Sequence, residues 1–231
     1  ARPLSDTDWH IPRLYDFARN MGASLLIGNY SRLVVDLNRP EDDQPLYTTA
    51  TTGLFPETLF DGRACFISGK TPSPQERQSY LLHIWRPYHQ QLQSELDRLK
   101  AQFGYALLLD AHSIASVIPR LFEGQLPDLN FGTNSGVSCD LSLSDQLIEC
   151  CQHQSTFSHI LNGRFKGGHI TRSYGLPQNQ QHAVQLELSQ LNYMSETEPY
   201  HYLPERAVHL QQLLEQLIHT MLSWGEQRYQ R

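Results

Sequence analysis

The chain has 231 residues, of which 39% are hydrophobic and 18% are charged, and its formal net charge is −6. These values are typical of one globular domain with a buried core, and they argue against a disordered protein and against a nucleic-acid-binding protein with a basic patch. No apolar run approaches the roughly 18 residues of a membrane span, and we recognise no signal peptide. We therefore expect a single cytoplasmic domain over residues 1–231.

In the first third of the chain, apolar residues on one face and a following Gly22 predict a helix over Asp8–Met21. The cores LLI and LVV predict strands within residues 23–31 and 32–40. Residues 41–74 are rich in Pro, Gly, Thr and Asp and predict a long loop, a type of segment that is often functional when ordered.

In the remainder, helices alternate with short apolar strands. The expected elements are a helix over Glu76–Phe103, a strand over Tyr105–Ser113, a helix over Leu143–Gln152, strands over Phe157–Leu161 and Ala183–Ser189, and a helix over Glu205–Gln227. This alternation indicates an α/β fold with helices on the faces of a sheet.

The four cysteines, Cys65, Cys139, Cys150 and Cys151, have no C-x-x-C spacing, which favours reduced thiols over disulfides or a cysteine zinc site.

The strand LLLDAHS places Asp110, His112 and Ser113 at its polar end. Chemistry in α/β sheets gathers at the carboxyl ends of strands, and an imidazole held through its second nitrogen is a natural Zn²⁺ ligand. The alternative is a polar turn that caps the strand, and the spacing alone favours it.

Asn38 and Arg39 follow another apolar stretch. Arginine offers a planar fork that binds carboxylates, and asparagine can add a hydrogen bond. The alternative is a turn before Pro40 with Arg39 in solvent, which the residues alone favour.

Glu187 lies in the strand QLELSQ, where two-residue alternation puts it on one face with Gln185 and Ser189. A carboxylate in such a strand either faces a cavity or is paired. A glutamate beside a metal-bound water is the general base that a hydrolase needs.

The segment GRFKGGHITRSYG, residues 163–175, surrounds four basic residues with glycines: Arg164, Lys166, His169 and Arg172. We expect a flexible cationic loop that acts as a lid or anion site, with an ordinary surface hairpin as the alternative.

Six stretches together resemble the N-formylglutamate amidohydrolase (deformylase) family: DTDWHIPRLYDFA, SRLVVDLNRP, WRPYHQQL, DAHSIASVIPRLFEGQLPDLNFGT, NGRFKGGHITRSYG and HAVQLELSQLNYM. The resemblance extends from about Asp6 to the final helix. It implies a mixed central sheet with helices on both faces, similar to that of the zinc carboxypeptidases and aspartoacylase.

The resemblance also implies one Zn²⁺, or another divalent ion, bound by His112 and by Asp8 in preference to Asp6. Family members usually begin with a strand that ends in Pro-His-[Ala/Ser]-Gly, whose histidine resembles a first zinc ligand. This sequence lacks that motif, and we expect that it is a trimmed form from which the strand is missing.

For catalysis, the resemblance implies hydrolysis of N-formyl-L-glutamate to formate and L-glutamate in histidine degradation. Glu187 would activate the water, and Arg32 or Arg120 would stabilise the oxyanion. Asn38, Arg39 and Arg172 would hold the substrate carboxylates.

His182 would contact the substrate as well, although a packed histidine is an equal alternative.

Two rival functions remain: a metal-dependent hydrolase or carboxypeptidase-like enzyme for another N-acyl amino acid, and a metal-free binding protein that keeps the anion site.

Overall fold

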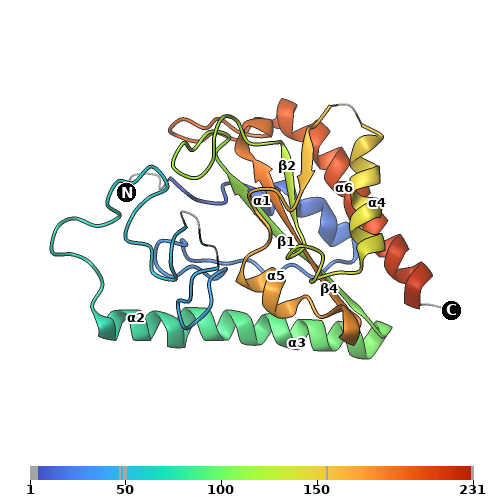
Figure 1. The fold of residues 1–231 in the computed structure, drawn as a ribbon, viewed down its shortest axis with the longest axis horizontal. Helices are drawn as coiled ribbons and strands as arrows, with labels where there is room; N and C mark the ends of the chain where they lie inside the picture. The colour runs from blue at the N-terminus through green and yellow to red at the C-terminus, as the bar shows by residue number, and fades with distance from the viewer. Residues whose placement is uncertain (1–4, 47, 49–50, 155, 230–231) are drawn as a thin grey trace.

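The computed structural model describes residues 5–46, 48, 51–154 and 156–229 (Figure 1). Its elements in chain order are α1 (Ile11–Leu14), the 3₁₀ helix η1 (Asp16–Met21), α2 (Pro74–Tyr80), the π-helical η2 (Leu81–Trp85), α3 (Arg86–Phe103), β1 (Ala106–Ile114), β2 (Leu129–Gly132), α4 (Leu141–Gln152), β3 (His159–Leu161), α5 (His169–Tyr174), η3 (Pro177–Asn179), β4 (Gln181–Ser189), η4 (Gln190–Asn192) and α6 (Pro204–Tyr229). Among these residues, no helix is both long and apolar enough to span a membrane.

The described strands form one mixed sheet in the order β1-β4-β2-β3. β1 runs parallel to β4, β2 runs antiparallel to β4, and β3 runs parallel to β2. In the register of β1 with β4, Asp110 lies opposite Gln185 and His112 lies opposite Glu187. Because side chains alternate along a strand, these four polar residues share one face of the sheet.

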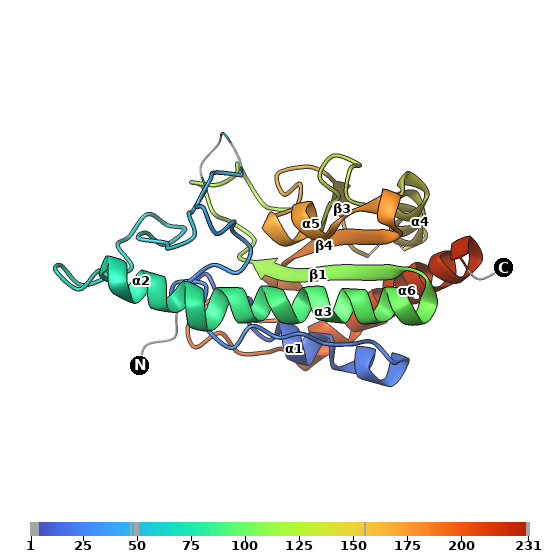
Figure 2. The same cartoon turned by 90° about the horizontal axis from the view of Figure 1, so that it is seen from below.

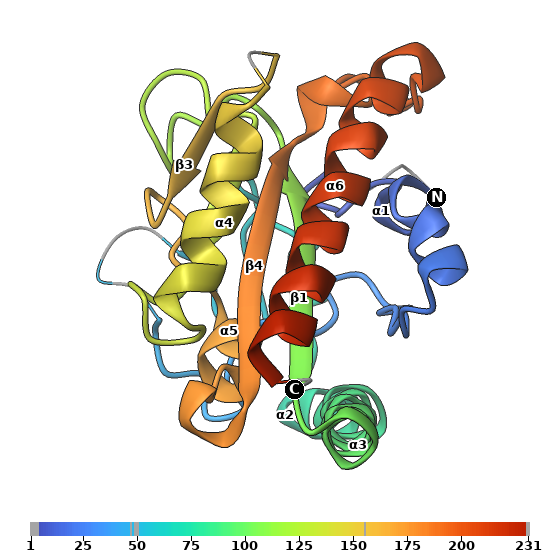
Figure 3. The same ribbon diagram turned by 90° about the vertical axis from the view of Figure 1, so that its right-hand side faces the viewer.

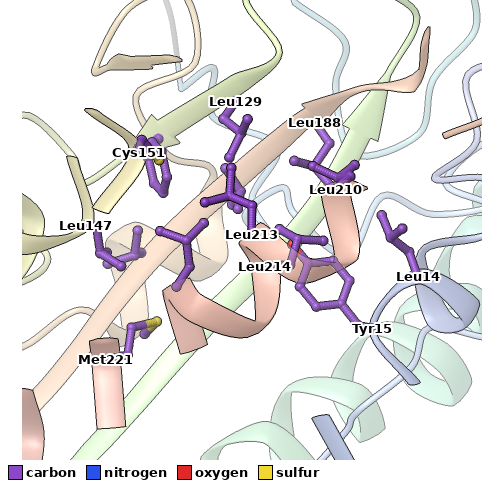
Figure 4. Close-up of a cluster of buried hydrophobic side chains, with 14 of the residues drawn as sticks. Leu14, Tyr15, Leu129, Leu147, Cys151, Leu188, Leu210, Leu213, Leu214 and Met221 are labelled. Atoms are coloured by element: carbon purple, nitrogen blue, oxygen red, sulfur yellow. The ribbon is translucent and has the colours of Figure 1, made fainter. Parts of the chain in front are cut away.

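The opposite face of the sheet is apolar. Leu186 and Leu188 alternate with the polar residues of β4 and are completely buried. Helices α4 and α6 lie side by side over this face (Figure 3), and their packed side chains form the main core (Figure 4), which includes Leu143, Leu147, Leu210, Leu213, Leu214 and Leu217. Each fully buried leucine contributes roughly 2 kcal/mol through the removal of apolar surface from water.

Helices α3 and α5 pack on the polar side. Helix α3 runs alongside β1 (Figure 2), and its Leu92 and Leu96 join a second apolar cluster with Ala106, Ile170 and Tyr174. The expected mixed sheet with helices on both faces is therefore confirmed.

The expected long helix is also present, as the consecutive elements α2, η2 and α3. A capping box between Ser73 and Glu76 begins it, and Gly104, with a φ of 84°, ends it. From this helix Trp85 Nε1 donates to the Arg39 carbonyl at 3.0 Å, and His89 Nε2 donates to the Leu37 carbonyl at 3.0 Å. The helix thus binds the main chain of residues 37–39 directly.

Two expectations for the first 40 residues are wrong. The single helix over residues 8–21 is replaced by the short α1 and η1, and residues 23–40 form no strand. Local turns take the place of a ladder, because the Val34 amide donates to the Ser31 carbonyl and the Arg39 amide donates to the Asp36 carbonyl. Of the LVV residues, Val35 is buried in a cluster with Leu54 and Trp85 rather than in a sheet.

Strand β2 and helix α5 are among the elements that were not expected. Strand β2 lies in a region expected to be loop, where it pairs with both β3 and β4. Within the cationic segment, residues 169–174 form α5, whose Ile170, Thr171 and Tyr174 are buried. Residues 169–174 of the segment are therefore anchored in the core, in place of the flexible loop or hairpin that we expected.

Candidate active site

A cavity of about 980 Å³ extends along β1, and its walls include residues of α3 and α6. Six of the nine expected site residues line it: Asp8, Arg32, Asn38, Arg39, His112 and Glu187. They come from the N-terminal segment, from the turns at residues 32–39, and from the polar face of β1 and β4. The fold therefore gathers at one cavity residues that are far apart in the sequence.

His112 is held between two carboxylates. Its Nε2 lies 2.8 Å from Asp110 Oδ1, and its Nδ1 lies 3.4 Å from Asp8 Oδ2. Asp8 is fixed in turn, because its Oδ1 accepts a hydrogen bond of 2.7 Å from the Ser113 amide. Burial lowers the pKa of His112, but the charges of Asp110 and Asp8 outweigh this and raise the pKa well above its usual value.

The donor set here fits a divalent metal in part. Asp8 Oδ2 and the Nδ1 of His112 lie side by side, and Asp110 on the far ring nitrogen is the usual second partner of a metal-bound histidine. A catalytic zinc normally has three protein ligands. The described residues contain no group of three histidine, cysteine or acidic side chains that could hold an ion. They therefore supply two donors of such a site.

Glu187 lies across the strand pair from His112 and is buried, with 9% of its surface exposed. Burial raises its pKa to about 8, the positive charge of His112 opposes this rise, and the charges of Asp8 and Asp110 add to it. Gln185 Nε2 lies 3.5 Å from Glu187 Oε2. A carboxyl group with this pKa can both accept and return a proton near neutral pH.

Asn38 connects the strands to α5. Its Nδ2 lies 3.1 Å from Asp110 Oδ2 and 2.9 Å from the Nε2 of His112, and its Oδ1 accepts a 2.8 Å hydrogen bond from the Ile170 amide. Gly168 makes this contact possible, since a Cβ there would lie 2.3 Å from Asn38 Oδ1. In this structure the amide of Asn38 therefore orients protein groups.

Arg39 and Arg32 are both anchored at Thr52. Arg39 Nε donates to the Thr52 carbonyl at 2.7 Å, and its Nη1 donates to the Asn38 carbonyl at 2.9 Å. Arg32 Nη2 donates to Thr52 Oγ1 at 2.6 Å, whereas its buried Nη1 has no hydrogen-bond partner among the described residues. The guanidinium of Arg32 also lies over the ring of Phe60 at 4.5 Å. The turn alternative placed Arg39 in solvent, whereas these contacts hold its side chain against the protein.

The structure does not bring the other three expected residues to the cavity wall. Arg120 is exposed, and its Nε donates to the Phe60 carbonyl at 3.0 Å. Arg172, on α5, donates from Nε to the Gly167 carbonyl at 2.9 Å.

His182 lies at the start of β4, on the same face as Leu186 and away from Glu187. Its Nδ1 accepts from the Asp140 amide at 3.1 Å, and its Nε2 lies 2.7 Å from the Tyr229 hydroxyl. These contacts favour the packed-histidine alternative for His182.

Sequence reasoning gave no site role to Asp36, Asp110 or Gln185. The two-residue period of a strand places Asp110 on the face of His112 and Gln185 on the face of Glu187. This alternation is therefore a sequence signal by which Asp110 and Gln185 could have been found. Asp36 has no comparable signal, since its role depends on the turns that replace the expected strand. For the metal-ligand pair, the structure places Asp8 beside His112, whereas Asp6 Oδ2 accepts from the Phe60 amide at 2.5 Å.

The fold and this cavity define an α/β protein with a buried histidine–carboxylate–arginine site on the polar face of a mixed sheet. Residues 1–194 match the family model described as N-formylglutamate amidohydrolase, and the chain belongs to that family.

Two relatives named N-formylglutamate deformylase support this assignment. The relative from Pseudomonas putida is 60% identical over 100% of this chain and 86% of its own length, and the relative from Pseudomonas aeruginosa is 58% identical over 99% and 86%. Among solved structures, N-formylglutamate amidohydrolase from Ralstonia eutropha JMP134 has a TM-score of 0.77 and 24% identity, covering 95% of this chain and 82% of that one. This structure shares the fold.

Proposed function

We propose that the protein hydrolyses the formyl amide of N-formyl-L-glutamate, releasing formate and L-glutamate, as a step in histidine degradation. The observation that carries the proposal is that His112 on β1 and Glu187 on β4 lie opposite each other in the strand register. Both line a cavity that Arg32 and Arg39 also line. The names of the two Pseudomonas relatives supply the substrate.

We further propose that Zn²⁺, or another divalent ion, is held by the Nδ1 of His112, by the carboxylate of Asp8 and by one ligand that the described residues do not provide. When bound, such an ion lowers the pKa of water and polarises a carbonyl group. Asp110 holds the imidazole from its other nitrogen and thereby sets the tautomer that leaves Nδ1 for the metal.

In the proposed reaction, Glu187 takes a proton from the attacking water and returns it to the nitrogen of the departing glutamate. Arg32 donates from Nη1 to the oxygen of the formyl carbonyl as negative charge develops on it. Arg39 binds a substrate carboxylate, and Asn38 keeps α5 and Asp110, the partner of His112, in place. The likeness to zinc carboxypeptidases that the motifs imply belongs to the same proposal.

The size of the cavity favours one second candidate. A volume of about 980 Å³ is at the upper end of the range for small-molecule sites, whereas a formyl group is among the smallest acyl groups. A hydrolase for a larger N-acyl amino acid is therefore the alternative.

The test is formate release from N-formyl-L-glutamate, measured with and without a chelator and beside N-acetyl-L-glutamate as the larger substrate. We expect formate release that the chelator abolishes and that Zn²⁺ restores, with slower turnover of the acetyl compound. Release that the chelator does not affect would reject the metal, and faster turnover of the acetyl compound would favour the second candidate. Binding without release would reject hydrolysis.

A further inference from the structure

The carboxylate of Asp36 lies between the two arginines of the cavity. Its Oδ2 is 2.5 Å from Arg32 Nη2 and 4.0 Å from Arg39 Nη1, and its Oδ1 accepts a 2.9 Å hydrogen bond from the Asn38 amide. The Asp36 side chain is 7% exposed, and each arginine side chain is 15% exposed. One buried acid therefore contacts three groups of the proposed site, although it does not itself bind substrate.

The charges explain why a carboxylate is needed at this position. Two guanidinium groups near one carboxylate repel each other at short range, and the repulsion is strong where solvent is scarce. Burial raises the pKa of Asp36, but the charges of Arg32 and Arg39 outweigh this effect and hold the pKa below its usual value. Asp36 is therefore ionised at neutral pH, and the three groups together keep one excess positive charge for an anion.

The geometry of Arg32 shows what this contact determines. Asp36 and Thr52 both bind Nη2, which leaves the buried Nη1 as the donor with no partner among the described residues. Without Asp36, Nη2 would lose its charged partner and the guanidinium could rotate. The donor to which the proposed function assigns the formyl oxygen would then no longer be fixed.

We propose that Asp36 is the positioning residue for substrate binding, which holds Arg32 and Arg39 at the separation and orientation that an anionic amino-acid derivative requires. The inference deepens the proposed function and rests on it for the identity of the substrate. It assigns no bond-making role to Asp36. Its effect is transmitted through the two arginines.

The alternative is that Asp36 serves only folding, as a buried ion pair and turn residue. Asp140 provides a matched control for this alternative at a remote place in the fold. Its Oδ1 accepts from the Ser142 amide two residues ahead at 2.9 Å, as Asp36 Oδ1 does from Asn38, and its Oδ2 pairs with Arg228 at 3.3 Å. Changing either aspartate to asparagine keeps the turn acceptor and removes one charge beside an arginine.

The experiment compares Asp36→Asn and Asp140→Asn with the unchanged protein. The affinity for glutarate, a dicarboxylate without an amide, is measured by calorimetry, and kcat and KM are measured for N-formyl-L-glutamate. We expect Asp36→Asn to weaken glutarate binding and to raise KM by about tenfold or more, and Asp140→Asn to change neither, at similar melting temperatures. A folded Asp36→Asn protein that binds glutarate as the unchanged protein does would overturn the proposal.

A second variant covers the case in which Asp36→Asn does not fold. Asp36→Glu keeps the charge and moves the carboxylate by one methylene, so its glutarate affinity should fall between those of the unchanged protein and of a protein that lacks Arg39. Equal affinity to the unchanged protein would again overturn the positioning role. Because glutarate binding needs no hydrolysis, a protein that binds glutarate and releases no formate would reject the proposed function alone. Failure of the unchanged protein to bind glutarate would reject both.

Discussion

The two faces of β4 are equally buried but differ in what burial does. On one face Leu186 and Leu188 remove apolar surface from water and stabilise the fold. On the other face Gln185 and Glu187 lose water as well, and burial raises the pKa of Glu187 to about 8. Desolvation therefore stabilises the fold on one face and shifts the pKa of a carboxyl group on the other. Under the proposed function, a single strand separates folding from chemistry.

The largest effect should come from Glu187→Gln, which preserves shape and removes the proton acceptor. If the polar face serves chemistry, the rate of formate release falls by roughly 10³-fold, while the melting temperature stays equal or rises because the variant has no carboxyl group at position 187 whose ionisation burial disfavours. Initial rates and thermal unfolding measure the two effects. An active variant would show that Glu187 is not the base.

Leu186→Ala tests the apolar face at the neighbouring position. A cavity in the core should lower the free energy of unfolding by about 3 kcal/mol. Denaturant unfolding measures this loss, and kcat per folded molecule should remain within a few-fold of the unchanged value. A loss of kcat as large as that of Glu187→Gln would contradict the separation of the two faces.

Lowering the pH should destabilise the folded protein through His182, which lies on the apolar face of β4. Burial lowers its pKa to about 4, with the charge of Asp140 opposing this, so the folded protein leaves the ring neutral where the unfolded chain protonates it. The unfolded state therefore takes up the extra proton, and stability falls as the pH drops from about 6.5 to 4, by about 3 kcal/mol. Unfolding across this pH range should show a shallower slope for His182→Asn. An unchanged slope would assign the acid sensitivity to another group, for which His89 is the next candidate.

The smallest effect should come from Gly168→Ala, which tests the polar face from outside the sheet. The added methyl group must displace the Asn38 side chain, whose Oδ1 would lie 2.3 Å away. We expect kcat/KM to fall by about tenfold through the misplaced Asn38, and the melting temperature to fall as well because Asn38 loses buried hydrogen bonds. Full activity would show that Asn38 does not orient the site. Gly104→Ala is the control, since no atom lies within 4 Å of its added Cβ, and the strain of its φ of 84° affects stability alone.

The parts of the site that follow a regular period could be predicted from the sequence. Alternation along β4 places Glu187 on the polar face, and the strand-end position of His112 indicates a functional site. The local structure of the irregular segments could not be predicted, because Arg32, Asp36 and Asn38 acquire their positions from turns and from distant partners; the family resemblance alone pointed to Arg32 and Asn38. The pattern LVV is typical of a strand, yet its Val35 packs with Trp85 and Leu54 instead. Likewise, α5 has only six residues beside glycines, and its helical state depends on burial of Ile170 and Tyr174.

Trp85 and His89 donate hydrogen bonds to the main-chain carbonyl groups of Arg39 and Leu37. Neither contact involves the side chain of the residue that accepts it. These two hydrogen bonds do not depend on the side chain at position 39, so a neutral residue there would leave them in place. It would remove the hydrogen bonds that the Arg39 side chain makes to the carbonyls of Thr52 and Asn38. If Arg39 binds a substrate carboxylate as proposed, this position is accordingly the place at which substrate preference could be redirected toward uncharged amides while α3 still holds the main chain.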